Sequence, residues 1–330
     1  MRKNRRTILL FTAFLVCIAL VSAVLFNLDR IMLAINGTPA GNSNDRTDTL
    51  DTVYIDGEAY RPKSTVKNYV IIGIDQYGAT ESNGYAQADF ILVLSFDSAD
   101  NSYRVIPINR DTMTEILVYD AFSGESKETV AQIALSHNDG TYTEISNTRK
   151  SKNTTKAVSD LLYGVEFKNY VSMSMNTIGI IVDHIGGVEV YVEDDMTSVD
   201  ERLVAGQTVM LDGELATKFI GARGGVSDGT NVSRIKRQMV FFDAFIEKAS
   251  SSQIDEELLL ECYESVEDYI VTNAGEGIFG EISEKLSSYE KKETIMIPGE
   301  SKVGKKYMEF YVDEEGLKDI VTDVFYKKAN

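Results

Sequence analysis

Hydrophobic residues first concentrate in one long run near the N-terminus. Residues 8–26 carry no charge, and only Thr12 and Ser22 interrupt the run. A helix of this length spans roughly 28 Å, which matches the hydrocarbon core of a membrane. Basic residues precede the run and Asp29 follows it, which predicts a cytoplasmic N-terminus. Residues 1–29 therefore predict a cytoplasmic stub and a transmembrane helix; the alternative is a cleaved signal peptide, whose apolar region is normally shorter.

A polar segment separates this run from the rest of the chain. Residues 37–66 are rich in Gly, Asn, Asp and Thr and poor in apolar residues. This composition predicts an extracellular linker over residues 30–66, with a short strand at 52–55. Residues 67–330 are then predicted to form one folded domain.

Apolar runs and helical periodicities alternate along that domain. The runs predict strands at 69–74, 90–96, 103–108, 188–192 and 293–297. The periodicities predict helices at about 128–137, 154–163, 174–184, 212–221, 232–248 and 314–326. Residues 97–102 have the composition of a hairpin turn between the second and third strands. The alternation indicates an α/β fold with a layered sheet.

Charge and composition exclude several classes of function. Acidic residues outnumber basic ones by 51 to 33, for a net charge of −18, so nucleic acid is not an expected partner. Any phosphate must be held by a local arginine cluster. Two cysteines and two histidines exclude a disulfide framework, a cysteine-based zinc site and a three-histidine metal centre. An external chain without disulfides suits a bacterial envelope.

Charged residues stand directly at the ends of three predicted strands. Asp75 follows the strand at 69–74, Asp89 precedes the next strand, and Arg110 and Asp111 follow the third. If the strands are antiparallel neighbours, these positions meet at one edge of the sheet. Carboxylates at such an edge suit Mg²⁺, which takes a few protein oxygens and completes its shell from phosphates.

More arginines surround the predicted helix at 232–248. Arg223 lies in the glycine-rich loop before it, and Arg234 and Arg237 lie three apart in its first turns. Arginines at a helix N-terminus favour anion binding. Residues 225–229 (GVSDG) match the nucleophile-elbow pattern, but a predicted helix precedes them and no histidine follows His184, so a loop is the better interpretation. For His137 and His184 we expect structural roles.

Six segments occur together in a fixed order. They are residues 72–75 (IGID), 87–93 (QADFILV), 106–112 (IPINRDT), 182–190 (VDHIGGVEV), 211–216 (LDGELA) and 234–238 (RIKRQ). In this set the chain resembles the LytR-CpsA-Psr (LCP) family of bacterial cell-envelope glycopolymer phosphotransferases, from about residue 67 to the end. The resemblance implies a layered α/β/α domain with a central mixed sheet and an apolar groove for a polyprenyl chain. It also implies transfer of a glycopolymer from a polyprenyl-pyrophosphate carrier to a peptidoglycan sugar hydroxyl, with release of polyprenyl phosphate, at the cell membrane.

The resemblance also assigns roles to residues. Asp75 and Asp89 match the positions of a Mg²⁺-binding pair. The catalytic candidates are Arg110, Asp111 and Arg223, of which Asp111 is either a base that assists deprotonation of the acceptor or an ion-pair partner that holds an arginine. The positions that match a pyrophosphate clamp are Arg110, Arg223, Arg234, Arg237 and Gln238.

The chain departs from the family pattern at several of these positions. Tyr77, Gln87 and Gly221 stand where the family often has arginine. Asn231 stands where it usually has aspartate, unless Asp228 takes that place. An alternative function is therefore a non-catalytic polyprenyl-phosphate-binding or regulatory envelope protein. A third possibility is an unrelated anchored scaffold, which would lack a lipid groove.

Overall fold

The computed structural model describes residues 52–75, 86–119, 125–137, 147–249 and 256–329. Its centre is a six-stranded mixed sheet in the order β11-β8-β3-β4-β5-β12. The strands are β3 (Val66–Ile74), β4 (Ala88–Asp97), β5 (Ser102–Ile108), β8 (Asn169–Ser174), β11 (Ile270–Thr272) and β12 (Glu290–Lys291). The strands β3, β4 and β5 form an antiparallel meander, whereas β8 runs parallel to β3 and β12 runs parallel to β5. The expected α/β class with a central mixed sheet is confirmed.

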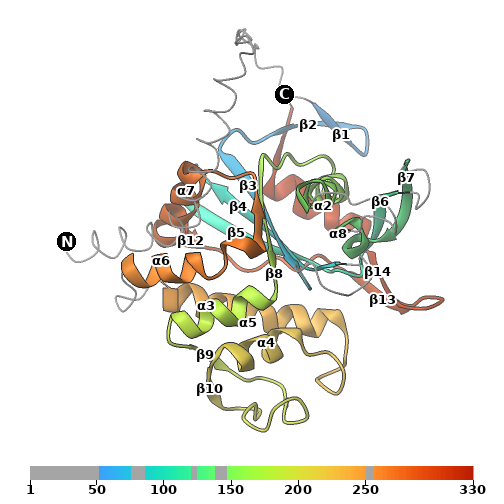
Figure 1. Cartoon of the computed structure of the whole chain (residues 1–330). Coiled ribbons are helices and arrows are strands. Elements are labelled where there is room, and N and C mark those ends of the chain that lie inside the picture. Colours follow the sequence, from blue (N-terminus) through green and yellow to red (C-terminus); the bar gives the residue numbers. More distant parts are fainter. Residues whose placement is uncertain (1–51, 76–85, 120–124, 138–146, 250–255, 330) are drawn as a thin grey trace.

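Side chains of β4 alternate between two cores. Leu92, Leu94 and Phe96 pack with residues of α5 and α7, whereas Ile91 and Val93 pack on the opposite face with residues of α2 and α8. These helices are α2 (Asn147–Leu161), α5 (Asn231–Ala249), α7 (Glu276–Ser288) and α8 (Glu314–Val324). Figure 1 shows α2 and α8 together on one side of the sheet and α7 on the other. The sheet is thus the middle layer of an α/β/α arrangement.

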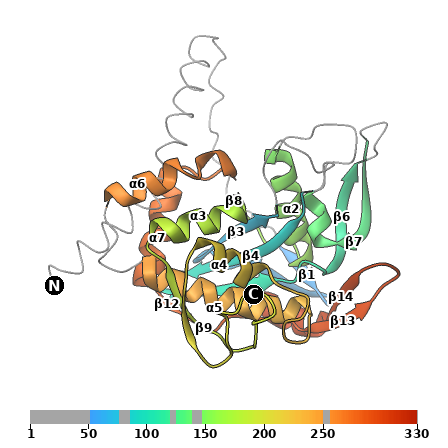
Figure 2. The ribbon, with the colours of Figure 1, turned by 60° about the horizontal axis from the view of Figure 1, so that its bottom comes forward.

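A third core lies beside this sandwich. It gathers residues of α3 (Asn176–His184), α4 (Gly213–Gly221), α6 (Glu256–Glu264) and the hairpin of β9 (Val188–Tyr191) and β10 (Thr208–Leu211). Phe241 of α5 belongs to this core, while Ile235 and Met239 of the same helix pack on the central sheet. Figure 2 shows α3, α4 and α5 grouped on this side of the molecule. Helix α5 therefore joins the two parts through two of its faces.

Three smaller sheets complete the fold. One hairpin joins β6 (Met113–Tyr119) and β7 (Ser126–Gln132), and another joins β13 (Gly299–Val303) and β14 (Met308–Val312). The third sheet pairs β1 (Val53–Ile55) with β2 (Glu58–Pro62) and β2 with β15 (Tyr326–Lys328). Since Ile55 is buried in the core, the folded part of the chain includes residues 53–62 of the predicted linker.

Most predicted elements are confirmed, and two are wrong. The strands of the meander, the strand at 188–192 and the helices of α2, α3, α4, α5 and α8 are present. Residues 126–132, however, form β7, followed by the 3₁₀ helix η1 (Ile133–His137), where a helix was predicted over 128–137. Pairing with β6 over seven residues determines the conformation of this exposed segment, which its own periodicity does not reveal. Residues 293–297 form no strand; Ile295 N donates one bond to Val105 O.

The predicted transmembrane helix at residues 8–26 lies outside the described residues. Among the residues that the structure does describe, no helix has both the length and the apolar character needed to span a membrane.

Candidate active site

Asp89 lies at a β-bulge in the central sheet. Gly73 pairs with Phe90 and Ile74 pairs with Ala88, so Asp89 has no partner residue on β3. An extra residue of this kind bends the strand and redirects a side chain. The bulge coincides with the carboxyl end of β3, where Gln87 N donates to Asp75 Oδ1 at 3.1 Å. The prediction that the end of β3 and the start of β4 lie at the same edge of the sheet is thereby confirmed.

Three arginines from distant segments converge on the Asp89 carboxylate. Arg110, which follows β5, binds Oδ1, and Arg223, from the α4–α5 loop, lies 3.1 Å from Oδ2. Arg234, in the first turn of α5, lies 3.6 Å from Oδ2 and donates to the Asp89 carbonyl oxygen at 3.0 Å. We call Asp89 and these three arginines the Asp89 cluster. The three guanidinium groups thus converge on one carboxylate; the side chains of Arg110 and Arg234 are buried, and that of Arg223 is 40% exposed.

The charges of the cluster are partly buried, so each of them needs a neighbouring charge of opposite sign. Only 3% of the Arg234 side chain is exposed, and burial, together with nearby Arg223, lowers the pKa of Arg234 to about 9. Arg234 is still protonated at neutral pH, so its charge needs anions nearby. Asp89 supplies one such anion, and a bound phosphate group would supply more.

Asp111 lies beside the cluster in a different environment. Burial raises the pKa of its carboxyl group, although the nearby cations Arg110, Arg223 and Arg234 oppose that rise. Gln132 donates to Asp111 Oδ1 at 3.1 Å, and Arg110 Nε lies 3.6 Å from the same oxygen. A buried carboxylate with a raised pKa is suited to accept a proton near neutral pH.

Several buried donors at the site make no hydrogen bond within the described residues. They are Arg110 Nε, Arg234 Nε and Asn109 Nδ2. Asn109 is held in place because its Oδ1 accepts from Asn231 Nδ2 at 2.7 Å and from Asp111 N at 2.9 Å. Buried polar groups normally have partners, so unpaired donors beside a cationic cluster favour a ligand rich in anionic oxygens.

The other two residues of the predicted clamp lie elsewhere. Arg237 Nε donates to the Phe219 carbonyl at 2.6 Å, and its Nη2 binds the Ala222 carbonyl. Gln238 Nε2 donates to the Ile220 carbonyl at 3.1 Å. Both side chains thus satisfy carbonyls at the C-terminal end of α4, where a cation is also favoured by the helix dipole. They support the loop that carries Arg223 and do not reach the Asp89 carboxylate.

Two site residues had no role in the sequence-based prediction. The Gln87 side chain accepts a hydrogen bond from Arg110, at a position noted only as a departure from the family. Gln132 reaches Asp111 from the end of β7, a strand that was predicted as a helix. Asp228 accepts bonds from Thr230 N and from the Ser233 hydroxyl at the start of α5, while Asn231 binds Asn109. Asp228 therefore stabilises the helix start instead of joining the cluster.

An apolar groove of about 200 Å³ begins next to the cluster. Phe90, the neighbour of Asp89, lines it together with Gly73, and the groove continues along the sheet to Tyr69 and Leu94. On its other side it is lined by α5, including Phe242. The groove and the cationic cluster therefore meet between two consecutive residues of β4.

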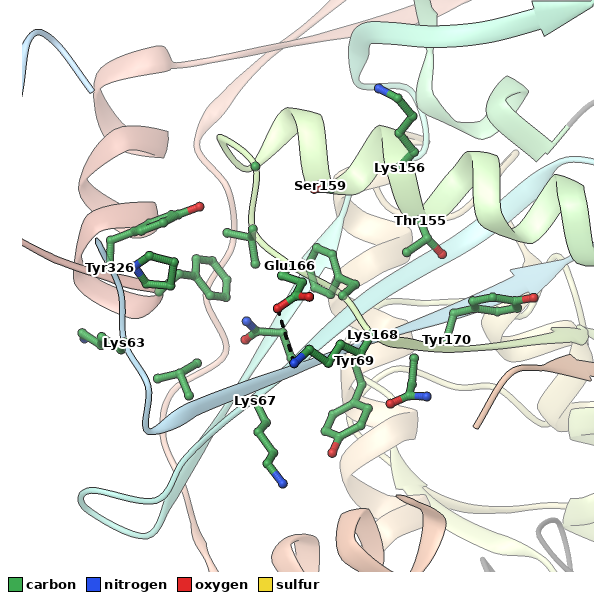
Figure 3. Close-up of a pocket in the computed structure, with 18 of the residues that line it drawn as sticks. Lys63, Lys67, Tyr69, Thr155, Lys156, Ser159, Glu166, Lys168, Tyr170 and Tyr326 are labelled. Carbon is green, nitrogen blue, oxygen red and sulfur yellow. Dashed lines mark ion pairs between the residues drawn. The ribbon is translucent and has the colours of Figure 1, made fainter. Parts of the chain in front are cut away.

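A larger cavity of about 1100 Å³ lies near the start of β3, at the end opposite Asp75. Several of the lysines that line it bind other groups: Lys63 the Asp323 carbonyl, Lys67 Glu281 at 2.7 Å, Lys156 Asp160, and Lys168 Glu166 at 3.7 Å. Figure 3 shows the ammonium groups of Lys67 and Lys156 pointing in opposite directions. Without convergent charges, this cavity is a weaker candidate than the Asp89 cluster despite its volume.

The histidines and Ser227 of the GVSDG loop have surroundings of their own. His137 is buried with Nδ1 3.3 Å from the Ala86 carbonyl, and His184 bonds to Ile180 O and to the Ser265 hydroxyl. Ser227 lies in the loop between α4 and α5 with φ of 50°. The expected structural roles and the expected loop agree with this arrangement.

Asp75 and Asp89 provide oxygen ligands of the kind that Mg²⁺ prefers. Among the described residues, no group of three or more His, Cys, Asp or Glu side chains is arranged to hold a metal ion. A Mg²⁺ ion that also binds phosphates needs only one or two carboxylates. The three arginines of the cluster balance the charges of Asp75, Asp89 and Asp111, so a bound pyrophosphate would require additional positive charge. The residues present therefore fit a Mg²⁺ ion that enters with its phosphate ligand.

The comparisons identify the family of the chain. The model of the LytR_cpsA_psr family matches residues 35–325, so the chain belongs to this family. Members of the family are phosphotransferases known for attaching cell-wall glycopolymers. No curated protein sequence matches the chain.

Solved structures share the fold at low sequence identity. The crystal structure of B. subtilis TagV is 19% identical with a TM-score of 0.59, over 79% of this chain and 96% of that one. TagT bound to LI-WTA is 17% identical with a TM-score of 0.57, over 79% and 90%. A protein from Enterococcus faecalis described as a transcriptional regulator is 18% identical with a TM-score of 0.56, over 78% and 86%. At these identities the likeness supports the fold alone.

Proposed function

We propose that this chain is a single-pass bacterial membrane protein that transfers a glycopolymer from a polyprenyl-pyrophosphate carrier to a peptidoglycan sugar hydroxyl. One observation carries the proposal: Asp89 gathers three arginines, while the next residue, Phe90, lines an apolar groove. A ligand that fits both must have an anionic head and an apolar tail. A polyprenyl pyrophosphate has this construction.

The descriptions of two similar structures point to different functions. TagT is bound to LI-WTA in its solved structure, which supports a glycopolymer as the group transferred. The E. faecalis protein is described as a regulator of transcription. A net charge of −18 opposes nucleic-acid binding by this chain, so we favour the glycopolymer.

The proposed reaction assigns a task to each group at the site. Arg110, Arg223 and Arg234 release Asp89 in part and bind the non-bridging oxygens of the pyrophosphate. The acceptor hydroxyl oxygen forms a bond to the sugar-proximal phosphorus, and the bond from this phosphorus to the bridging oxygen breaks. Asp111 takes the hydroxyl proton, and polyprenyl phosphate leaves with the bridging oxygen.

In this proposal Asp75 and Asp89 hold Mg²⁺. When bound, the ion would neutralise charge on the phosphate oxygens and so favour attack. Asp89 would then serve two purposes: in the absence of donor it holds the arginines together, and with donor it takes part in binding the ion.

The test uses the full-length chain in detergent with Mg²⁺, a pyrophosphate-linked donor and soluble peptidoglycan fragments, and follows polyprenyl phosphate by mass spectrometry. We expect Arg110→Ala to lower kcat/KM by about 10²–10³-fold, because it removes a donor to the reacting phosphate. Arg104→Ala, at the opposite end of β5, is the matched control and should leave turnover unchanged. Equal turnover by Arg110→Ala and the wild type would refute the assignment of the Asp89 cluster as the active site.

The alternative is a lipid-binding or regulatory protein without turnover. Gln87 and Gly221 favour it, because each stands where the family often has arginine and the cluster is correspondingly less cationic. It predicts that polyprenyl phosphate binds with saturation while no product forms with any acceptor on long incubation. Lipid that co-purifies with the detergent-extracted protein, identified by mass spectrometry, would be expected under either function, so turnover is the measurement that separates them.

A further inference from the structure

A second groove, of about 850 Å³, lies between two β-hairpins next to the candidate site. One wall is the β6–β7 hairpin and the other is the β13–β14 hairpin. Figures 1 and 2 both show these hairpins on the same side of the molecule. We call this the hairpin groove.

Exposed apolar side chains concentrate on these hairpins. Nine large hydrophobic side chains are exposed in the described part of the chain, and five of them belong here: Val130, Val303, Tyr307, Met308 and Tyr311. Val303 and Tyr307 are 84% and 70% exposed. Apolar groups gathered in this way mark a binding surface more often than scattered ones do.

The groove is physically connected to the proposed base. Gln132, which lines the groove, donates to Asp111 Oδ1 at 3.1 Å and to the Met308 carbonyl at 2.6 Å. Phe310 N donates to the Asp111 carbonyl at 2.8 Å, and Thr112 pairs with Phe310. The lining of the hairpin groove is therefore linked to the Asp111 carboxylate through Gln132, whereas the apolar groove meets the cluster at Phe90.

The lining favours a glycan over a lipid tail. Tyr307 and Tyr311 offer flat rings with polar hydroxyls, which match the apolar faces and polar rims of sugar rings. One face of Tyr311 is covered by the Lys302 ammonium group, 5.4 Å from the ring centroid. Lys305 and Lys306 outnumber Glu309, the one acidic residue of the lining, so an acceptor with carboxylates is electrostatically complementary.

We propose that the hairpin groove binds the glycan strand of the acceptor and presents its hydroxyl to Asp111, with Tyr307 and Tyr311 as stacking residues. This inference rests on the proposed function because it names the acceptor subsite of the same reaction. It divides the site into a donor side, with the cluster and the apolar groove, and an acceptor side made by the two hairpins.

The absence of tryptophan from the chain provides a clean test. Tyr307→Trp keeps an aromatic ring in the lining of the groove and introduces the only tryptophan of the chain, whose fluorescence can be excited selectively over that of the tyrosines. Full-length Tyr307→Trp protein in detergent is titrated with short soluble peptidoglycan fragments. We expect a saturable change in fluorescence, and none for the matched control Tyr191→Trp, which is exposed on β9.

A kinetic experiment completes the test. Tyr307→Ala should raise the KM for the acceptor by about tenfold and leave the affinity for the donor unchanged. Turnover without any saturable signal from Tyr307→Trp would overturn the acceptor groove and leave the proposed function intact. A saturable signal in a protein without turnover would support the groove and refute the proposed transfer. A response to anionic vesicles but not to glycan fragments would overturn the inference in favour of a membrane surface.

Discussion

Asp89 organises the candidate site because a single carboxylate holds guanidinium groups from three parts of the chain. Without it, Arg110, Arg223 and Arg234 would repel one another in a site where Arg234 is almost fully buried. The same arrangement prepares the donors for phosphate oxygens before any ligand enters. Preorganised charge of this kind is the main contribution that proteins make to phosphoryl transfer.

The pH dependence of the reaction should report on Asp111. A base must be deprotonated, and burial raises the pKa of this carboxyl group, so activity should fall as the pH drops through a value above the ordinary aspartate range. Asp111→Asn should lower kcat by about 10²–10⁴-fold and remove this acid limb. The measurement is the pH profile of kcat/KM for the wild type and the variant.

Gln132→Leu tests the same assignment independently. Its amide donates to the charged form of Asp111, so its loss should raise the pKa further and move the acid limb to higher pH. An Asp111→Asn variant that kept both its rate and its pH profile would show that Asp111 only positions Arg110.

The sequence predicted which strand ends would meet at the candidate site better than it predicted the contacts of individual side chains. Charged residues at the ends of apolar strands predicted that Asp75, Asp89, Arg110 and Asp111 would meet, because a meander brings those positions to one end of a sheet. The roles of Arg237 and Gln238 at the end of α4 depend on the packing of two helices, which residue spacing does not encode. Gln132 was missed because β7 forms only by pairing with β6.

Two of the ordered segments that suggested the family hold helices together. Asp183 of α3 accepts from Gly213 N at 2.7 Å, and Asp212 accepts from Leu215 N at 2.8 Å to begin α4. Helices α3 and α4 approach so closely that a Cβ atom added at Gly213 would lie 2.2 Å from the Gly179 carbonyl oxygen. The small residues and carboxylates of these segments are therefore explained by packing.

This contact yields a stability prediction for α4. Gly213→Ala should lower the free energy of unfolding by about 1–3 kcal/mol, because backbone atoms of α3 must move to admit the methyl group. Gly221→Ala in the same helix is the matched control, since no atom lies within 4 Å of its added Cβ, and it should be neutral or slightly stabilising. Urea denaturation of both variants measures the difference, and equal midpoints would contradict the close approach.

The architecture as a whole separates an apolar binding surface from a polar one. The bulge in β4 places Asp89 among arginines, while Phe90, Leu92 and Leu94 face the groove under α5 and α7. The bulge and the strand alternation together thus place the charged cluster and the apolar groove on separate sides of β4. The groove volume of about 200 Å³ is below the usual range of ligand sites, so under the proposed function it would hold only the first part of a long tail.

Filling the groove should separate tail binding from head binding. Val171 on β8 lines the groove. Val171→Phe should therefore lower the affinity for a polyprenyl pyrophosphate by at least about tenfold. The affinity for inorganic pyrophosphate should be unchanged, because the variant leaves the Asp89 cluster intact. Val271→Phe, on β11 and packed against the opposite core, is the matched control and should change neither affinity. Displacement of a fluorescent prenyl pyrophosphate measures both. If Val171→Phe bound the lipid as the wild type does, the tail would have to lie outside this groove. The adjacency of Asp89 and Phe90 would then no longer support the proposed binding of a polyprenyl pyrophosphate.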